Sequence, residues 1–167
     1  MKTLIATACV LLVAAIANAQ CYNKTPAYTM AHWAQVKFAA LEGMYVQWDV
    51  TKPGQYDSAP LVAPGRQSFG MGYGYALKFT RLPGRYGVEL FGTFEVLPPD
   101  WRSLAYLAHN AITVEITQEE IDQALAGKLV SKVIYLPKGS VAGPPAAGRE
   151  TVLAILRLGN RFPRTRE

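Results

Sequence analysis

The stretch that decides the fold is GVELFGTFEVL, residues 87–97. Apolar side chains recur in it at every second position, with Gly92 as the gap, and these are Val88, Leu90, Phe94 and Val96. Successive side chains of a β-strand point to opposite faces, so this pattern predicts a half-buried strand. The same period of two recurs in 35–41, 44–50, 75–80 and 112–117, while 129–136 is a strongly apolar strand and 151–158 is apolar on both faces, which indicates a central strand. The sequence therefore predicts a mainly β protein.

Proline and glycine separate these segments. Leu82-Pro83-Gly84-Arg85 has the composition of a tight turn, and Pro98-Pro99 ends the strand that follows it. Glu42-Gly43 interrupts the first two segments, which we expect to form a hairpin. Residues 51–74 are rich in both residue types, so they predict a long connection with one short strand near 61–62.

One segment of the chain carries a helix signal. Thr117 and Glu120 have the spacing of a capping box, Ile116 can pack on Ile121, and Gly127 supplies a C-terminal stop. A short helix is predicted over residues 118–126. Residues 101–110 favour neither a helix nor a strand.

Length and pattern together indicate one domain. A chain of 167 residues suits a single core, and half of its residues are apolar. Short strands joined by Pro/Gly turns predict a single antiparallel β-sandwich, immunoglobulin-like or transthyretin-like in general architecture, with one short helix. We assign residues 35–160 to this sandwich, 20–34 to an N-terminal extension and 161–167 to a basic C-terminal tail.

Residues 1–19 have the features of a signal peptide. Lys2 precedes an apolar run over residues 4–16, and Ala17-Asn18-Ala19 is a small-residue cleavage site. The alternative is a membrane anchor, but the run is shorter than the roughly 20 apolar residues that span a bilayer. We expect cleavage before Gln20, no transmembrane segment afterwards, and a secreted, periplasmic or cell-surface location.

The charge and the cysteines limit the partners. The formal net charge of +5 is modest and no recognition module is evident, so nucleic-acid binding is not expected. The arginines of the tail fit two interpretations, a solvated chain end or a contact with an anionic envelope surface. Cys9 lies in the predicted leader, which leaves Cys21 for an intermolecular disulfide, a modification or a free thiol.

Catalytic groups are scarce. His32 and His109 are the two histidines, and no Cys/His/Asp spacing resembles a metal site, so no cofactor or metal is expected. His109 is a weak candidate for a general base with Asp100 or Asp122 and Ser103. The alternative is a histidine at a strand entry, hydrogen-bonded through the backbone and Asn110.

Aromatic residues are the better candidates for a binding surface. Rings offer contact area to sugars and peptides, although many rings in a β protein simply pack in the core. The candidate binding residues are Tyr73, Tyr75, Arg85, Tyr86, Phe91 and Trp101.

Several motifs carry a resemblance to a known family. They are LPGRYGVEL (82–90), TFEV (93–96), YLAHN (106–110), KVIYLP (132–137) and LAILRLGN (153–160). Over about residues 60–160 the chain resembles a family of secreted proteins from planctomycete-type bacteria that has no assigned activity. The resemblance implies export and supplies no catalytic residue that could be assigned to this chain. The chain departs from the family at Phe91-Gly92 and Lys138-Gly139.

The sequence therefore predicts an exported cell-envelope protein that acts by surface binding or scaffolding, without catalysis. Its partner would be an envelope protein or a polysaccharide, and self-association is possible. Two alternatives stay open, namely a structural subunit of an extracellular assembly and a small envelope hydrolase that uses His109.

Overall fold

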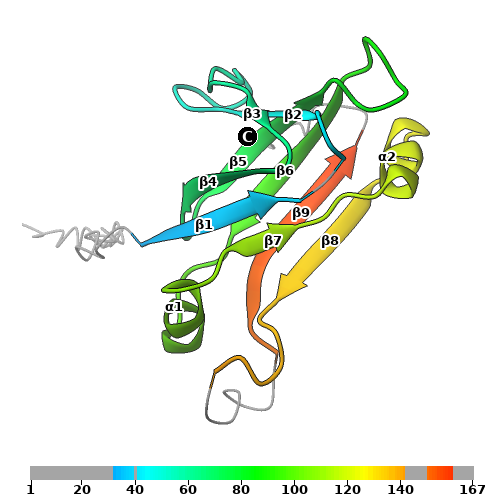
Figure 1. The fold of residues 1–167 in the computed structure, drawn as a ribbon. Coiled ribbons are helices and arrows are strands. Elements are labelled where there is room, and N and C mark those ends of the chain that lie inside the picture. The colour runs from blue at the N-terminus through cyan, green and yellow to red at the C-terminus, as the bar shows by residue number, and fades with distance from the viewer. Residues whose placement is uncertain (1–31, 40, 142–149, 160–167) are drawn as a thin grey trace, which may run out of the picture.

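The computed structural model describes residues 32–39, 41–141 and 150–159 (Figure 1). The predicted leader, Cys21 and the basic tail lie outside the described residues, as does most of the N-terminal extension. Within the described ranges the protein is mainly β, with two sheets and two short helices. In the same ranges, no helix has the length and apolar character needed to cross a membrane.

The larger sheet has six strands, all antiparallel to their neighbours. In chain order they are β2 (Tyr45–Trp48), β3 (Leu61–Val62), β5 (Gly74–Thr80), β6 (Leu90–Val96), β8 (Val130–Tyr135) and β9 (Val152–Gly159). Their order across the sheet is β3-β2-β5-β6-β9-β8. The predicted strands near 61–62, 75–80, 129–136 and 151–158 are confirmed, and β9 lies between two others as its two apolar faces suggest.

The smaller sheet has three strands, β1 (Trp33–Phe38), β4 (Gly65–Gly70) and β7 (Ile112–Val114), in the order β4-β1-β7. β1 pairs antiparallel with β4 but parallel with β7. The expectation of purely antiparallel pairing is therefore wrong at this one edge. The chain between β1 and β7 passes through β2 to β6 and helix α1 (Trp101–Leu107), and a connection of this length allows a parallel pair.

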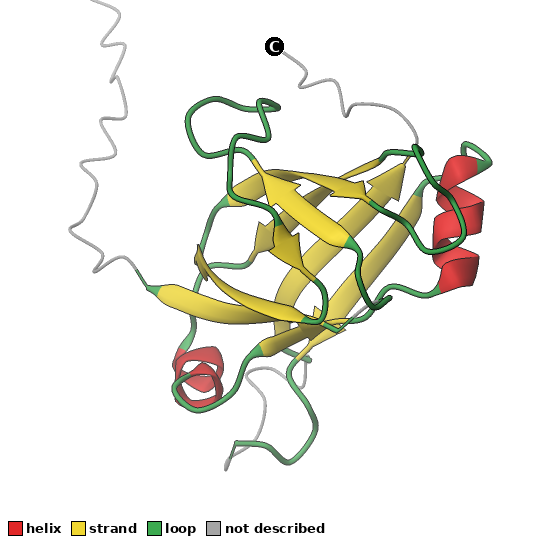
Figure 2. Ribbon diagram, turned by 45° about the horizontal axis from the view of Figure 1, so that its top comes forward, coloured by secondary structure: helices red, strands yellow, loops and turns green. Residues whose placement is uncertain are grey.

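The two sheets face each other across one core (Figure 2). On β6, Leu90, Phe94 and Val96 are buried, which confirms the period of two that the sequence shows there. From the smaller sheet, Phe38 and Phe69 reach the Phe94 ring, with centroids 6.0 and 5.6 Å away. Aromatic contacts across the interior therefore join the two layers.

The predicted hairpin of 35–41 with 44–50 is wrong. β1 belongs to the smaller sheet and β2 to the larger one, so these two segments do not pair. Gly43 takes φ +81°, and its N–H donates to the Ala63 carbonyl oxygen, while the Ala63 N–H donates to Met44. These long-range bonds carry the chain from one layer to the other, and a local pattern does not contain them.

The segment rich in proline and glycine also contains more structure than expected. It holds β4 in addition to β3, because Gly65–Gly70 pairs along its whole length with β1. β1 itself begins at Trp33, which lies inside the predicted N-terminal extension. A glycine-containing strand is stable here because it pairs along its length with β1 and buries Phe69 near its end.

The predicted helix is confirmed as α2 (Gln118–Leu125). Thr117 accepts a hydrogen bond from the Glu120 N–H and Glu120 accepts one from the Thr117 N–H, as a capping box requires. Burial raises the pKa of Glu120, but hydrogen bonds from Lys132 and Thr117 outweigh it and leave the pKa below its ordinary value.

The expectation of a single helix is wrong, because α1 is a second one. Asp100 caps it by accepting from the Ser103 N–H at 2.7 Å, and the Ser103 hydroxyl oxygen accepts from the Asp100 N–H at 2.9 Å. This box uses serine where glutamate is usual, so the sequence signal is weak. Figures 1 and 2 show α1 and α2 at different ends of the sheets.

Gly92 provides a test of the contact between β6 and β9. A Cβ atom at this position would lie 2.5 Å from the Arg157 carbonyl oxygen and 3.1 Å from Leu158 Cδ2. We expect Gly92→Ala to lower the free energy of unfolding by about 1–3 kcal/mol, because the two strands must separate to accept the methyl group. Urea unfolding monitored by circular dichroism measures the change. Gly159→Ala is the control, since its nearest neighbour would be 4.0 Å away; equal losses in the two variants contradict the prediction.

Candidate binding site

The loop over residues 49–58 is held by two aspartates. Asp49 accepts hydrogen bonds from the N–H groups of Ala76 on β5 (2.8 Å) and Gly54 (3.3 Å). Asp57 accepts from the N–H of Val50 at 2.7 Å and from the N–H and hydroxyl of Thr51. The Thr51 hydroxyl and these backbone donors lower the pKa of the Asp57 carboxyl. The loop is thus ordered by its own side chains.

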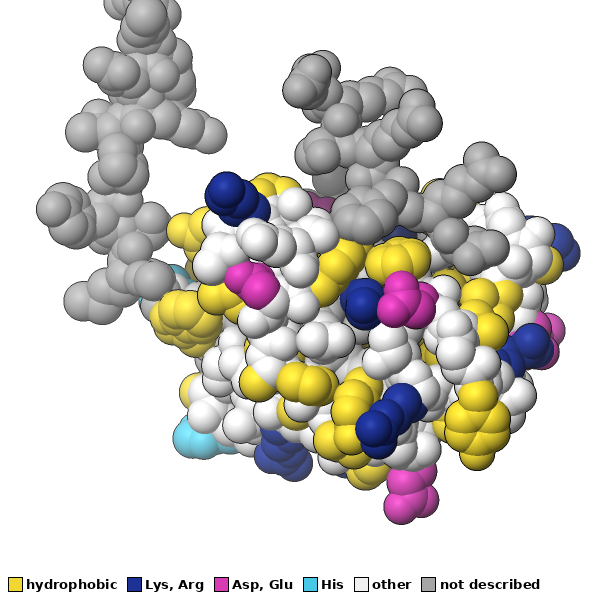
Figure 3. Space-filling model, turned by 90° about the horizontal axis from the view of Figure 1, so that it is seen from above, with side chains coloured by type: hydrophobic (Ala, Val, Ile, Leu, Met, Phe, Trp, Pro, Cys, Tyr) yellow, Lys and Arg dark blue, Asp and Glu magenta, His cyan; other side chains and the backbone are white. Residues whose placement is uncertain are grey.

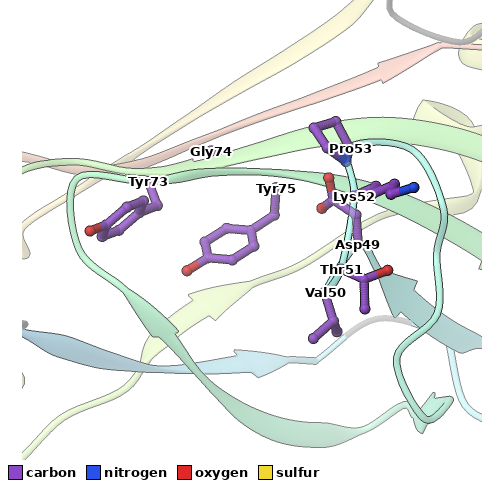
Figure 4. Close-up of a pocket in the computed structure, with 8 residues that line it drawn as sticks. All are labelled: Asp49, Val50, Thr51, Lys52, Pro53, Tyr73, Gly74 and Tyr75. Atoms are coloured by element: carbon purple, nitrogen blue, oxygen red, sulfur yellow. The ribbon is translucent and has the colours of Figure 1, made fainter.

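This loop and the start of β5 enclose an open hollow of about 140 Å³ (Figure 4). Five consecutive loop residues line one side, 49–53, and Tyr73, Gly74 and Tyr75 line the other. In Figure 4 the two tyrosine rings lie side by side, while the side chains of Asp49 and Lys52 come from the loop. The hollow therefore combines aromatic surface with an acid and a base.

The two tyrosines are placed by Gly70 at the end of β4. The Gly70 N–H donates to the Tyr75 hydroxyl oxygen at 2.8 Å. A Cβ atom on Gly70 would lie 3.0 Å from Tyr73 Cδ2 and 3.1 Å from that hydroxyl, so a side chain would press on both rings. Burial raises the pKa of Tyr75 above its ordinary value. Tyr73 keeps 62% of its surface exposed.

Two exposed tryptophans lie at the same end of the sheets. Trp33 pairs with Gly70 across the smaller sheet, and it is 64% exposed. Trp101 begins α1, just after the segment in which the Val96 N–H donates to the Tyr73 carbonyl oxygen. The Arg102 guanidinium lies 5.4 Å from the centroid of the Trp101 ring. Trp33, Tyr73 and Trp101 thus form what we term the aromatic end.

The structure does not gather all the predicted binding residues. Arg85 and Tyr86 lie in the turn between β5 and β6, at the opposite end from Tyr73, where Arg85 forms an ion pair with Asp122 of α2. Phe91 lies on the outer face of β6, and its ring centroid is 5.6 Å from that of Tyr56. Of the six candidates, Tyr73 and Tyr75 share the hollow and Trp101 lies near it.

The groups proposed to assist His109 lie apart or are already engaged. His109 is exposed in the turn after α1, and its N–H donates to the Tyr106 carbonyl oxygen. Asp100 and Ser103 bond each other in the cap of α1, and Asp122 pairs with Arg85 at the other end of the sheet. The Asn110 side-chain amide donates to the Tyr106 carbonyl oxygen at 2.9 Å.

The described surface has no strong charge of one sign on the face drawn in Figure 3, where basic and acidic side chains alternate with apolar ones. Five ion pairs join described residues, and these are Lys78–Glu89, Arg85–Asp122, Lys132–Glu120, Lys138–Glu150 and Arg157–Glu95. Within the described ranges, no cluster of three or more His, Cys, Asp or Glu side chains could hold a metal ion.

Tyr56 supplies a test of how the 49–58 loop is packed. Burial, followed by the charges of Asp49 and Glu89, raises the pKa of its phenol from 10.0 to about 12. The unfolded chain ionises first, so the stability that this group contributes is complete below pH 10 and is lost as the pH rises to about 12. We expect the free energy of unfolding of Tyr56→Phe, measured with urea, to fall less steeply between pH 10 and about 12 than that of the unaltered protein. Tyr86→Phe, at a fully exposed turn position, is the control; parallel curves for Tyr56→Phe and the unaltered protein contradict the prediction.

Two parts of this site were not predicted from the sequence. The loop residues 49–53 carry no motif, and their position depends on the bond between Asp49 and Ala76, which are 27 positions apart. Trp33 fell in a segment expected to lie outside the domain, and alternation alone does not mark an exposed ring as functional. Comparison of the chain with protein-family models, curated proteins and solved structures finds no match.

Proposed function

We propose that this protein is an exported component of a bacterial cell envelope that binds a polysaccharide through the hollow beside Tyr73 and Tyr75. The observation that carries the proposal is the pairing of an exposed tyrosine ring with polar groups from Asp49 and Lys52 at one open site. The predicted signal peptide and the resemblance to a family of secreted bacterial proteins support export.

A sugar-binding site needs an apolar surface and hydrogen-bonding groups side by side. One face of a pyranose ring carries C–H groups that pack against an aromatic ring, while its hydroxyls need hydrogen-bond partners at the edge. The Tyr73 ring offers the apolar surface. Tyr75 lies beside it, and the Asp49 carboxylate lies on the far side of Tyr75 in the same hollow. The Tyr75 oxygen already accepts from Gly70, so its own proton is directed to another acceptor.

The size of the hollow favours a polymer that is gripped at one unit. Pockets that enclose a whole small molecule measure roughly 300–1,000 Å³. About 140 Å³ with an open mouth suits one ring of a longer chain, whose neighbouring units lie on the surface. At the aromatic end, Trp33 and Trp101 offer further exposed apolar surface on which those neighbouring units could pack.

The same observations bear on the other expectations. The sandwich of immunoglobulin-like or transthyretin-like type remains part of the proposal, supported by two sheets packed across one core. The hydrolase alternative has less support, since the acids and the hydroxyl considered for His109 are engaged elsewhere. Cys21, in turn, keeps its proposed role in cross-linking or modification.

Tyr73→Ala tests the binding proposal. We expect it to weaken binding to immobilised bacterial polysaccharides by about tenfold, because the stacking surface is lost while the fold is retained. The probes are peptidoglycan, lipopolysaccharide and a neutral exopolysaccharide, measured by surface plasmon resonance.

Tyr86→Ala is the matched control, since it removes an exposed tyrosine from the opposite end of the sheets and should leave binding unchanged. The proposal fails if none of the three probes binds, or if Tyr86→Ala weakens binding as much as Tyr73→Ala.

Export has its own test. When the full chain is expressed in a bacterium with a secretory pathway, we expect the protein outside the cytoplasm with Gln20 as its first residue. Cell fractionation with N-terminal sequencing measures both. Ala17→Glu with Ala19→Glu should block processing, because the cleavage site accepts small residues. Retention of the uncleaved chain in the cytoplasm is the contrary result.

A further inference from the structure

β8 forms one border of the larger sheet (Figure 1). It pairs antiparallel with β9 on one side, from Val130 opposite Leu158 to Ile134 opposite Ala154. Among the described residues, no strand pairs with its other side. Alternate N–H and C=O groups along that side therefore lack a strand partner, and such a row can accept a further strand.

The two borders of this sheet differ in how they are protected. β3, at the opposite border, is two residues long and lies between Pro60 and Pro64, which cannot donate to a further strand. β8 has six residues and no proline. Short strands, prolines and β-bulges are common devices against unwanted pairing. β8 has neither of the first two, and its register with β9 shifts at one place, between Ile134 and Tyr135.

The side chains of β8 also favour pairing. Val133 and Tyr135 point outward and are 38% and 47% exposed. Lysine at a sheet border usually blocks pairing, but Lys132 is turned inward, where its ammonium binds Glu120 (2.8 Å) and the carbonyl oxygen of Glu115. The charge that would guard this edge is thus held by the protein's own α2.

We infer that β8 pairs antiparallel with β8 of a second copy of this chain, about a two-fold axis at Val133. This surface is distinct from the hollow, so the inference goes beyond the proposed polysaccharide binding.

The two-fold register makes the outer face self-complementary. It places Val133 opposite Val133 of the second copy, and Tyr135 of each copy opposite the small side chain of Ser131. Ser131 is itself opposite Arg157 of β9. Strands in a sheet lie about 4.8 Å apart, so the Tyr135 ring of one copy can extend over Ser131 to the Arg157 guanidinium of the other. On each side of the two-fold axis, the large Tyr135 ring of one copy thus lies opposite the small Ser131 side chain of the other.

The dimer should be weak. Stable interfaces bury about 1,200–2,000 Å² in total, and one pair of six-residue strands with their outer side chains falls below that range. Main-chain hydrogen bonds supply most of the affinity in strand addition, and the side chains choose the register. We therefore expect association in the micromolar to millimolar range.

Charge pairing at position 133 tests the inference. Sedimentation velocity over a concentration series should show reversible dimers of the purified full chain in reducing buffer, where neither cysteine can cross-link copies. Val133→Lys and Val133→Glu should each weaken association by at least tenfold, because each sets two like charges against one another at the axis. An equimolar mixture of the two variants should associate again, since lysine then faces glutamate.

Controls separate this edge from general surface effects. Val62→Lys makes the same change on β3 at the other border and should leave association unaltered. Tyr135→Ser removes the ring opposite Ser131 and should weaken association without a change in the circular dichroism spectrum. The inference is overturned if the unaltered protein stays monomeric at all concentrations, if Val62→Lys weakens association as Val133→Lys does, or if the folded lysine and glutamate variants fail to associate when mixed.

Discussion

The structure depends on the contacts of one ring, that of Phe69 on β4. Its centroid lies 4.8 Å from that of Tyr75, 5.2 Å from Trp48, 5.6 Å from Phe94 and 6.2 Å from Phe38. Three of these partners belong to the larger sheet, so Phe69 is the point at which the two layers meet. All four pairs are edge-to-face, one of the geometries that aromatic rings prefer.

The same ring explains why the hollow lies where it does. Tyr75 packs against Phe69 on one side and accepts a hydrogen bond from Gly70, the next residue of β4, on the other. The core therefore decides the position of a side chain that also lines the surface. Asp49 continues the pairing of β2 with β5 through its bond to Ala76, and this holds the opposite wall. Binding surface on a rigid scaffold of this kind loses little entropy on contact.

The two proposed surfaces use different properties of a β-sheet. The hollow uses side chains at the end of the strands, whereas the β8 border uses backbone groups that a sheet leaves unpaired at its edge. Since the surfaces are separate, a dimer would carry two hollows. Two weak sites on one particle bind a repetitive ligand more strongly than either does alone. Weak affinity at each surface is thus compatible with firm attachment to a polysaccharide.

Local sequence determined the elements whose signals lie within a few residues. Alternation in residues 87–97 predicted β6 and its buried face, and Thr117 with Glu120 predicted α2, because side-chain direction and helix capping depend on near neighbours. Tyr73 and Tyr75 were candidates from residue type alone. Tertiary structure decided which segments pair, so that 35–41 and 44–50 entered different sheets and β4 formed in a segment with several glycines. It also decided that Asp49 lines one hollow with the tyrosines and that, among the described residues, β8 borders the larger sheet with a strand on one side, because these depend on contacts between residues far apart in the chain.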